Sequence, residues 1–313
     1  MEPGEPGSLK PGVGAAAKRL RIDYATAEVL RAFKAAGVRS IVLKGAGLQR
    51  WLYAPADRRA YLDRDVLVPL AEFDAAGEVL AGLGFEPELE EADMPDWWRE
   101  HGLAWHRAKD NVAVDVHRAV SGVHVAGDRL WNTLSRHTER VDIGGYPAAT
   151  LDAPARALHL ALHAAQHAGS RRHVKDLERA IELADEETWL EAAALAVELE
   201  ATGALAAGLS FADGGAGLAK RLGLAVQRPV EVTLRAEGSV QALTVERFSR
   251  ARGRERLAML WHKLVPPSTF MRKWSPLARR GRLGLALAYV WRPLWILGSA
   301  PGALRAWLAA RRR

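Results

Sequence analysis

The sequence predicts an α/β fold of the α+β kind, in which a sheet-containing region is followed by an α-helical domain. Short apolar segments typical of strands occur at residues 40–43 and 62–68, and residues 103–107 and 111–118 form a predicted hairpin. After Ala149 the chain changes to Ala, Leu, Glu and Arg at helical spacing, with little strand signal. This change of sequence pattern predicts that the sheet-containing region comes first and the helical domain second.

The remaining elements follow from periodicity and from Gly and Pro at their ends. A Gly/Pro/Ala-rich tail precedes a first helix that stops before Gly37, and a short strand follows a second helix that ends at Gly84. The segment from Asp152 to Pro154 is a good helix start. The predicted helices cover residues 16–36, 48–53, 70–83, 152–169, 174–186, 187–202, 204–222 and 244–263, and the short strand covers 85–89.

Composition excludes several classes of protein. The 313 residues contain no cysteine, which rules out disulfides, cysteine-bound zinc and iron–sulfur clusters. The N-terminus lacks a basic and an apolar region, so we expect a cytoplasmic protein rather than a secreted one. The net charge of +7 is uneven: residues 246–313 hold sixteen Lys/Arg and two Asp/Glu, a local +14 that leaves about −7 for the rest.

One stretch carries most of the predicted chemistry. Asp63 and Asp65 lie two residues apart on a predicted strand, so both carboxylates share one face, where they repel unless a cation lies between them. Just before them, Lys44, Gly45 and Gly47 join a strand to a helix, an arrangement that can bind phosphate. A phosphate site beside a paired-aspartate metal site suits nucleotidyl transfer. The ordinary alternatives are a solvated strand edge and a plain strand-to-helix turn.

A third carboxylate is predicted on the hairpin. In residues 112–117 the valines share one face, and Asp115 and His117 share the other. Asp115 would complete the metal site, unless it only pairs with a helix arginine. His117 would contact the base, the acceptor or a metal, with a structural hydrogen bond as the alternative. Because two like charges repel, we expect Asn at position 63 or 65 to leave stability equal or higher.

Histidines recur on the first helix of the second half. His159, His163 and His167 lie at i, i+4 and i+8 on one face. Lacking an obvious carboxylate partner, they favour a packed seam or an acceptor pocket over a zinc site. Arg171, Arg172 and Lys175 favour a solvated helix end over a phosphate site.

With these residues in view, the chain resembles the polymerase-β-like nucleotidyltransferase superfamily, and within it a bacterial group of uncharacterised nucleotidyltransferases. The resemblance covers most of residues 20–300. Its motifs are Leu43-Lys44-Gly45, Leu52-Tyr53, Arg59-x-x-x-Asp63-x-Asp65-x-Leu67-Val68, Gly84-Phe85, Val114-Asp115-Val116-His117, His163 with His167, Lys175-Asp176-Leu177 and Arg292-Pro293. Two positions depart from the group: Arg64 stands where an apolar residue is usual, and Leu62 where a small one is.

The resemblance implies a mixed-sheet nucleotidyltransferase domain and two-metal chemistry with Mg²⁺, or Mn²⁺ as the alternative. It gives Asp63, Asp65 and Asp115 as metal ligands and catalytic residues, and Lys44, Gly45, Gly47 and Arg59 as nucleotide and phosphate ligands. The predicted segments are a mobile tail (1–17), the nucleotidyltransferase domain (18–150), an α-helical domain (151–265) and a basic Trp/Arg-rich helical segment (266–313).

The predicted function is therefore transfer of a nucleoside monophosphate from an NTP to a hydroxyl or phosphate of an acceptor, with release of pyrophosphate. The acceptor, a small molecule, a peptide or a protein, is expected to be anionic or phosphorylated if the basic segment faces it. The alternatives are a catalytically degenerate nucleotide-binding scaffold, and a membrane-surface or nucleic-acid binder that uses the basic segment.

The sequence of the C-terminal segment predicts that it packs against the rest of the protein rather than inserting into a membrane. Residues 283–300 are apolar, but Arg292-Pro293 interrupts them and leaves no uncharged stretch long enough to span a bilayer. We expect Trp274, Trp291, Trp295 and Trp307 to pack against the acidic helical domain, with arginines along one wall of the acceptor cleft.

Overall fold

The protein is described here from a computed structural model, which describes residues 11–54, 64–88, 102–167, 170–225 and 229–312. Its centre is a seven-stranded mixed sheet of order β3-β4-β5-β2-β1-β7-β6. The strands are β1 (Ile41–Val42), β2 (Asp65–Leu67), β3 (Glu86–Pro87), β4 (Gly102–Arg107), β5 (Val112–His117), β6 (Thr138–Ile143) and β7 (Tyr146–Leu151). The predicted α/β class with a mixed sheet and many helices is confirmed.

Parallel and antiparallel pairing alternate around β2. This strand pairs antiparallel with β1 and parallel with β5, and β1 pairs parallel with β7. The predicted hairpin is confirmed as the antiparallel pair β4–β5. The hairpin β6–β7 was not predicted from the sequence, although Gly144 and Gly145, both with positive φ, form its turn.

Helices cover both faces of the sheet. One face packs against α1 (Pro11–Ala35) and α3 (Phe73–Gly82), where Phe33 and Leu80 meet Val66 and Val114. Side chains of the opposite parity, such as Leu67, face the helical half. That half contains α2 (Ala46–Leu52), α4 (Gly127–Arg136), α5 (Ala153–Gln166), α6 (Arg171–Leu183), α7 (Glu186–Glu198), α8 (Thr202–Leu209) and α9 (Gly215–Arg221). The 3-10 turn η2 (Leu70–Glu72) leads into α3.

Arg64 lies on the α1 side of the sheet. Although the residue is buried, its guanidinium donates hydrogen bonds to the backbone carbonyls of Ile22 and Ala113. A charged side chain is tolerated at a normally apolar position because backbone oxygens satisfy it.

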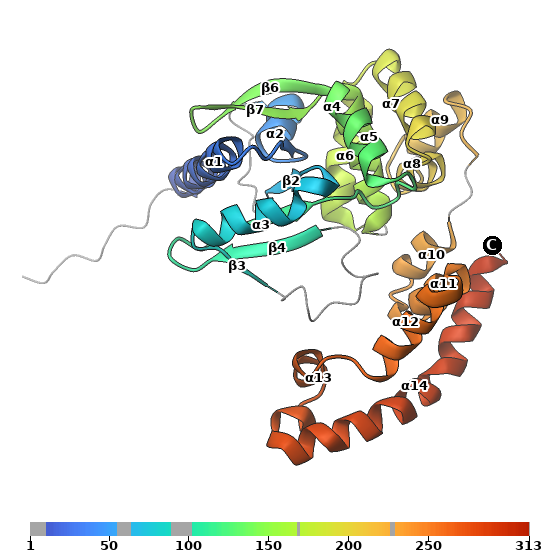
Figure 1. Ribbon diagram of the computed structural model, residues 1–313. Coiled ribbons are helices and arrows are strands. Elements are labelled where there is room, and N and C mark those ends of the chain that lie inside the picture. Colours follow the sequence, from blue (N-terminus) through green and yellow to red (C-terminus); the bar gives the residue numbers. More distant parts are fainter. Residues whose placement is uncertain (1–10, 55–63, 89–101, 168–169, 226–228, 313) are drawn as a thin grey trace, which may run out of the picture.

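The C-terminal helices form a further layer that extends from the helical half (Figure 1). They are α10 (Val230–Ala236), α11 (Val240–Arg250), α12 (Gly253–Leu264), α13 (Ser268–Trp274), η4 (Leu277–Arg279) and α14 (Gly281–Arg311). The predicted single helix over 244–263 is wrong, because Ala251 adopts an extended conformation between α11 and α12.

The apolar residues 283–300 lie within one long helix, α14. α14 continues through Pro293, and the neighbouring Arg292 turns inward, donates to the Lys263 carbonyl at 2.7 Å and lies over Trp274. By length and composition α14 could cross a membrane, with a mean hydropathy of 1.2 over its best 18-residue window. Among the described residues, only one of the four tryptophans meets the predicted helical domain (151–265): Trp307 donates to Glu246 of α11 and packs near Leu234. Trp274 instead meets Trp295, and Trp291 is exposed.

Candidate functional site

The sheet brings two of the predicted carboxylates side by side. Asp65 opens β2, Asp115 lies on β5, and the two residues are directly paired in the parallel register. Along β5 the valines are buried against α1 and α3, so Asp115 and His117 project from the other face with Asp65. The third carboxylate, Asp63, and the predicted phosphate ligand Arg59 lie outside the described residues.

Asp65 is buried, and its two carboxylate oxygens have different neighbours. Its Oδ1 accepts a hydrogen bond from His117 Nε2 at 2.8 Å, and its Oδ2 lies 3.1 Å from Lys44 Nζ. Burial alone would raise the pKa of Asp65, but the hydrogen bond from His117 and the charge of Lys44 hold that pKa far below its ordinary value. The carboxylate is therefore ionised at any physiological pH.

These partners change the expected effect of removing the charge. Lys44 is only 18% exposed at its side chain, so its ammonium would lose its carboxylate partner in an Asp65→Asn variant. The expectation of equal or higher stability considered repulsion alone, and it is replaced by an expected loss of stability.

A cation fits this donor set. Ligand atoms of Asp65, Asp115 and His117 all lie within 4.8 Å of one another, and two of the three residues offer the carboxylate oxygens that Mg²⁺ prefers. Lys44 Nζ lies 3.1 Å from Asp65 Oδ2, so a metal at this site would share that carboxylate with the ammonium or displace it. Asp65 and Asp115 are the residues that would hold a divalent metal.

The two predicted glycines, Gly45 and Gly47, are required for different structural reasons. Gly45 has a φ of +85°, which a side chain would strain, and it begins the turn from β1 into α2. Gly47 is closely packed, since a Cβ atom there would lie 3.1 Å from Thr150 Oγ1 and 3.3 Å from an Arg156 nitrogen. Gly47 thus lets α2 approach β7 and α5.

A cavity of about 340 Å³ extends from the carboxylates under α5 and α6. Lys44, Asp65, Asp115 and His117 line one part of it, and a histidine cluster lines the other. That cluster consists of His159, His163, His167 and His173. The position of α6 is fixed in part by a hydrogen bond from Tyr53 at the end of α2 to Asp176.

Burial lowers the pKa of His159, His163 and His167 well below the ordinary value of a histidine. Burial, followed by the charge of Lys44, lowers the pKa of His159 to about 3. Burial, followed by the proximity of His173, lowers the pKa of His167 to about 4. His163 Nε2 lies 2.8 Å from His173 Nδ1.

His173 was missed by sequence reasoning because it follows a turn and two arginines at the start of α6. The signal was present, since the turn after α5 is short enough to return the chain to the same histidines. Arg171 and Lys175 are exposed, as the solvated-end interpretation predicts.

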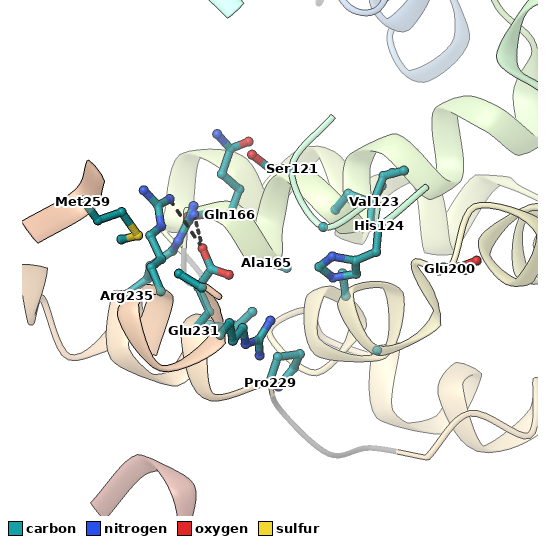
Figure 2. A pocket seen from close by; sticks show the side chains of 18 residues that line it. Ser121, Val123, His124, Ala165, Gln166, Glu200, Pro229, Glu231, Arg235 and Met259 are labelled. Atoms are coloured by element: carbon teal, nitrogen blue, oxygen red, sulfur yellow. Dashed lines mark hydrogen bonds and ion pairs between the residues drawn. The ribbon is translucent and has the colours of Figure 1, made fainter. Parts of the chain in front are cut away.

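A second cavity, of about 370 Å³, adjoins the first (Figure 2). Ser121 and Gln166 line both cavities. Its cationic wall comes from α10 and α11, where Arg235 lies 2.7 Å and Arg247 3.8 Å from Glu231. Arg250 lines the same wall.

Comparison with known proteins gives one family. A family model described as uncharacterised nucleotidyltransferase matches residues 12–214. No curated protein matches the chain.

Two solved structures show distant likeness. The antibiotic-resistance factor ANT(2'')-Ia is 14% identical, with 57% of this chain and 95% of that chain covered and a TM-score of 0.37. An antigenic nucleotidyltransferase-like protein from Paracoccidioides brasiliensis is 16% identical, with 61% and 94% covered and a TM-score of 0.36. Likenesses this distant say nothing about the substrate of this chain.

Proposed function

The chain belongs to the uncharacterised nucleotidyltransferase family, and we propose that it transfers a nucleoside monophosphate from an NTP to an acceptor hydroxyl or phosphate. One observation carries the proposal: Asp65 and Asp115 are paired on neighbouring strands and face one cavity. Mg²⁺, or Mn²⁺ in its place, would be held by these aspartates and by Asp63.

In the reaction an acceptor oxygen bonds to the α-phosphorus, and the bond from that phosphorus to the pyrophosphate oxygen breaks. When bound, the divalent metal supplies charge stabilisation for the attacking and leaving oxygens. Asp115 is the base that accepts the proton of the acceptor hydroxyl. Lys44 exchanges its contact with Asp65 for the triphosphate, and Gly45 and Arg59 bind the same phosphates.

The acceptor is proposed to be anionic. The adjoining cavity supports this, because three arginines line it against two glutamates and because Ser121 and Gln166 connect it to the aspartates. His117, which also lines the aspartate cavity, is held by Asp65 and would contact the acceptor or the base.

The test is incubation with each α-labelled NTP, Mg²⁺ and an extract of the host, followed by isolation of whatever becomes labelled. We expect a labelled product that disappears with Asp65→Asn and with Asp115→Asn and persists with Asp213→Asn, an exposed control. NTP binding that needs no metal and gives no turnover would contradict the proposal and favour a nucleotide-binding scaffold.

A further inference from the structure

The histidine cluster offers a metal site separate from the aspartates. His163 lies in the last turn of α5, His167 ends that helix, and His173 lies in the first turn of α6. Ligand nitrogens of these three residues all lie within 4.8 Å of one another. The rings pack closely, with centroids 4.1 to 4.4 Å apart in each pair.

We propose that His163, His167 and His173 bind one transition-metal ion of the zinc type, with a coordination position open to the cavity. Three imidazoles without a carboxylate are poor ligands for Mg²⁺ and good ones for Zn²⁺. In tetrahedral zinc sites with Zn–N bonds of about 2.0–2.1 Å, ligand nitrogens are about 3.3 Å apart. The 2.8 Å between His163 Nε2 and His173 Nδ1 must therefore widen by about 0.5 Å.

The ion would lie where the acceptor approaches. The three histidines line the same cavity as Asp65 and Asp115, and Gln166 beside them lines the neighbouring arginine-walled cavity. An open position at such a site can bind a water or an acceptor oxygen. Metal binding itself does not depend on the proposed transferase activity.

The experiment measures zinc bound to the metal-stripped full chain in excess Mg²⁺, which saturates the carboxylate site. We expect one Zn²⁺ per chain and, with Co²⁺, the visible absorption of a tetrahedral ion. His167→Gln, at an exposed position, and His173→Gln should each weaken Zn²⁺ binding at least tenfold. His262→Gln, a half-buried control on α12, should not.

Asp65→Asn separates the two metal sites and should keep its zinc. A wild-type chain that binds no zinc would overturn the proposal. So would unchanged binding in both cluster variants, which would leave only a hydrogen-bonded histidine cluster. Loss of zinc in Asp65→Asn with retention in His167→Gln would also overturn it, because the ion would then belong to the aspartates.

A second, independent observation concerns an exposed apolar stripe on α14. Leu283 is 83% exposed and Val290 67% exposed, although both are large apolar residues. The stripe consists of Leu283, Leu287, Val290, Leu294, Leu297, Leu304 and Leu308, at alternating spacings of four and three residues apart from one step at Pro301. On one helix this spacing gives a single continuous face.

The charge around the stripe has one sign. The sequence contains no Asp or Glu after Glu255. Within residues 268–312 the exposed cations are Arg272, Lys273, Arg279, Arg280, Arg282, Arg305, Arg311 and Arg312. A second copy of the chain would bring the same arginines against these and repel them, whereas anionic phospholipid offers both an apolar layer and negative headgroups.

We infer that α14 lies in the surface of an anionic membrane with its apolar stripe toward the acyl chains. Its other side is held by the protein, since Arg292 is buried against Trp274 and Tyr289 donates to the Pro266 carbonyl at 2.6 Å. A helix anchored along one side in this way lies on a bilayer more readily than it crosses one.

Sedimentation with vesicles tests this surface. The full chain should bind vesicles of equimolar phosphatidylglycerol and phosphatidylcholine, weakly bind pure phosphatidylcholine, and lose binding as salt rises. The double variant Leu287→Gln/Leu294→Gln should bind at least tenfold more weakly. The control Leu183→Gln/Leu190→Gln, with leucines 52% and 53% exposed against 58% and 57% in the stripe, should bind normally.

Three outcomes would overturn the inference. One is equal vesicle binding by the stripe variant and the wild type. Another is a stable dimer that dissociates in the stripe variant, which would make the stripe an interface between copies. The third is tight RNA binding without vesicle binding, which would assign the basic surface to nucleic acid.

Discussion

The sheet region buries its large apolar side chains, whereas the C-terminal helices leave several of theirs exposed. In the sheet region Phe33 and Leu80 are fully buried, because helices cover both faces of the sheet. In the C-terminal helices Leu283 and Val290 are largely exposed, because α14 is covered along one side only, by the shorter helices α10 to α13 and η4. The first region is closed around a polar cavity, and the second leaves an apolar face open.

This difference fits a chain in which one region carries out the chemistry and the other binds a membrane surface. The buried side gives fixed geometry, since Asp65 is held by Lys44 and His117 at defined distances. The exposed side gives a surface that fits a fluid partner, which needs apolar area and charge of one sign but no exact geometry. Chemistry and localisation would then reside in different parts of the chain.

The largest expected effect separates these two parts. Asp115→Asn should reduce transfer by roughly a hundredfold or more, because a charge that stabilises the reacting centre is lost, and should leave vesicle binding unchanged. The variant Leu287→Gln/Leu294→Gln should weaken vesicle binding and leave nucleotidyl transfer unchanged. Labelled-product assays and vesicle sedimentation on both variants measure this. A variant that impairs both functions equally, with its fold intact by circular dichroism, would break the division.

The next effect concerns stability. Leu80→Ala removes a fully buried side chain and should lower the free energy of unfolding by about 2–5 kcal/mol. Leu283→Ala removes an exposed one and should change it by less than about 0.5 kcal/mol. Urea unfolding of the two variants provides the measurement. If Leu283→Ala lowered the free energy of unfolding by more than about 1 kcal/mol, other parts of the protein would have to cover the stripe.

Much of the sheet region could be predicted because its pattern is local. The alternation of Val112, Val114 and Val116 with Asp115 and His117 fixed the face of β5, and the α/β class followed from the change of texture after Ala149. The hairpin β6–β7 was not predicted, because β6 is polar at exposed positions such as Glu139 and Arg140 and β7 contains Pro147, a residue uncommon in strands.

The C-terminal helices could not be predicted from local pattern. Whether Trp291 is buried depends on which helices cover α14, and a basic, apolar segment fits either a core or a membrane. Arg292 interrupts the uncharged run as the sequence predicts, but local pattern did not show that the helix continues through Pro293 or that Arg292 turns inward. His173 lies beside His163 only because the chain turns back between α5 and α6, which helical spacing alone does not show.

A smaller effect compares two glycines that both have a positive φ. Gly45 has φ +85° and ψ −126°, and Gly281 has φ +83°, so a side chain strains either position and Ala should cost about 1–3 kcal/mol of stability. Only Gly45→Ala should also weaken NTP binding, because Gly45 lies beside Lys44 in the proposed phosphate site. Urea unfolding and NTP titration check both expectations. Equal NTP binding by the two variants would remove Gly45 from the phosphate site.

The smallest expected effect lies where the two parts meet. Arg235 donates to the Gln166 carbonyl of α5 at 3.2 Å and pairs with Glu231, whose side chain is 28% exposed. Burial would raise the pKa of Glu231, but Arg235 and Arg247 lower it below the ordinary 4.5. A lowered folded-state pKa contributes stability that is present above pH 4.5 and lost as the pH falls through the folded pKa. Glu231→Gln should therefore cost about 1 kcal/mol or less at pH 7, and the difference from wild type should close in acid. Urea unfolding at a series of pH values measures the gap, and a gap that widens as the pH falls would show that Glu231 carries no such pairing.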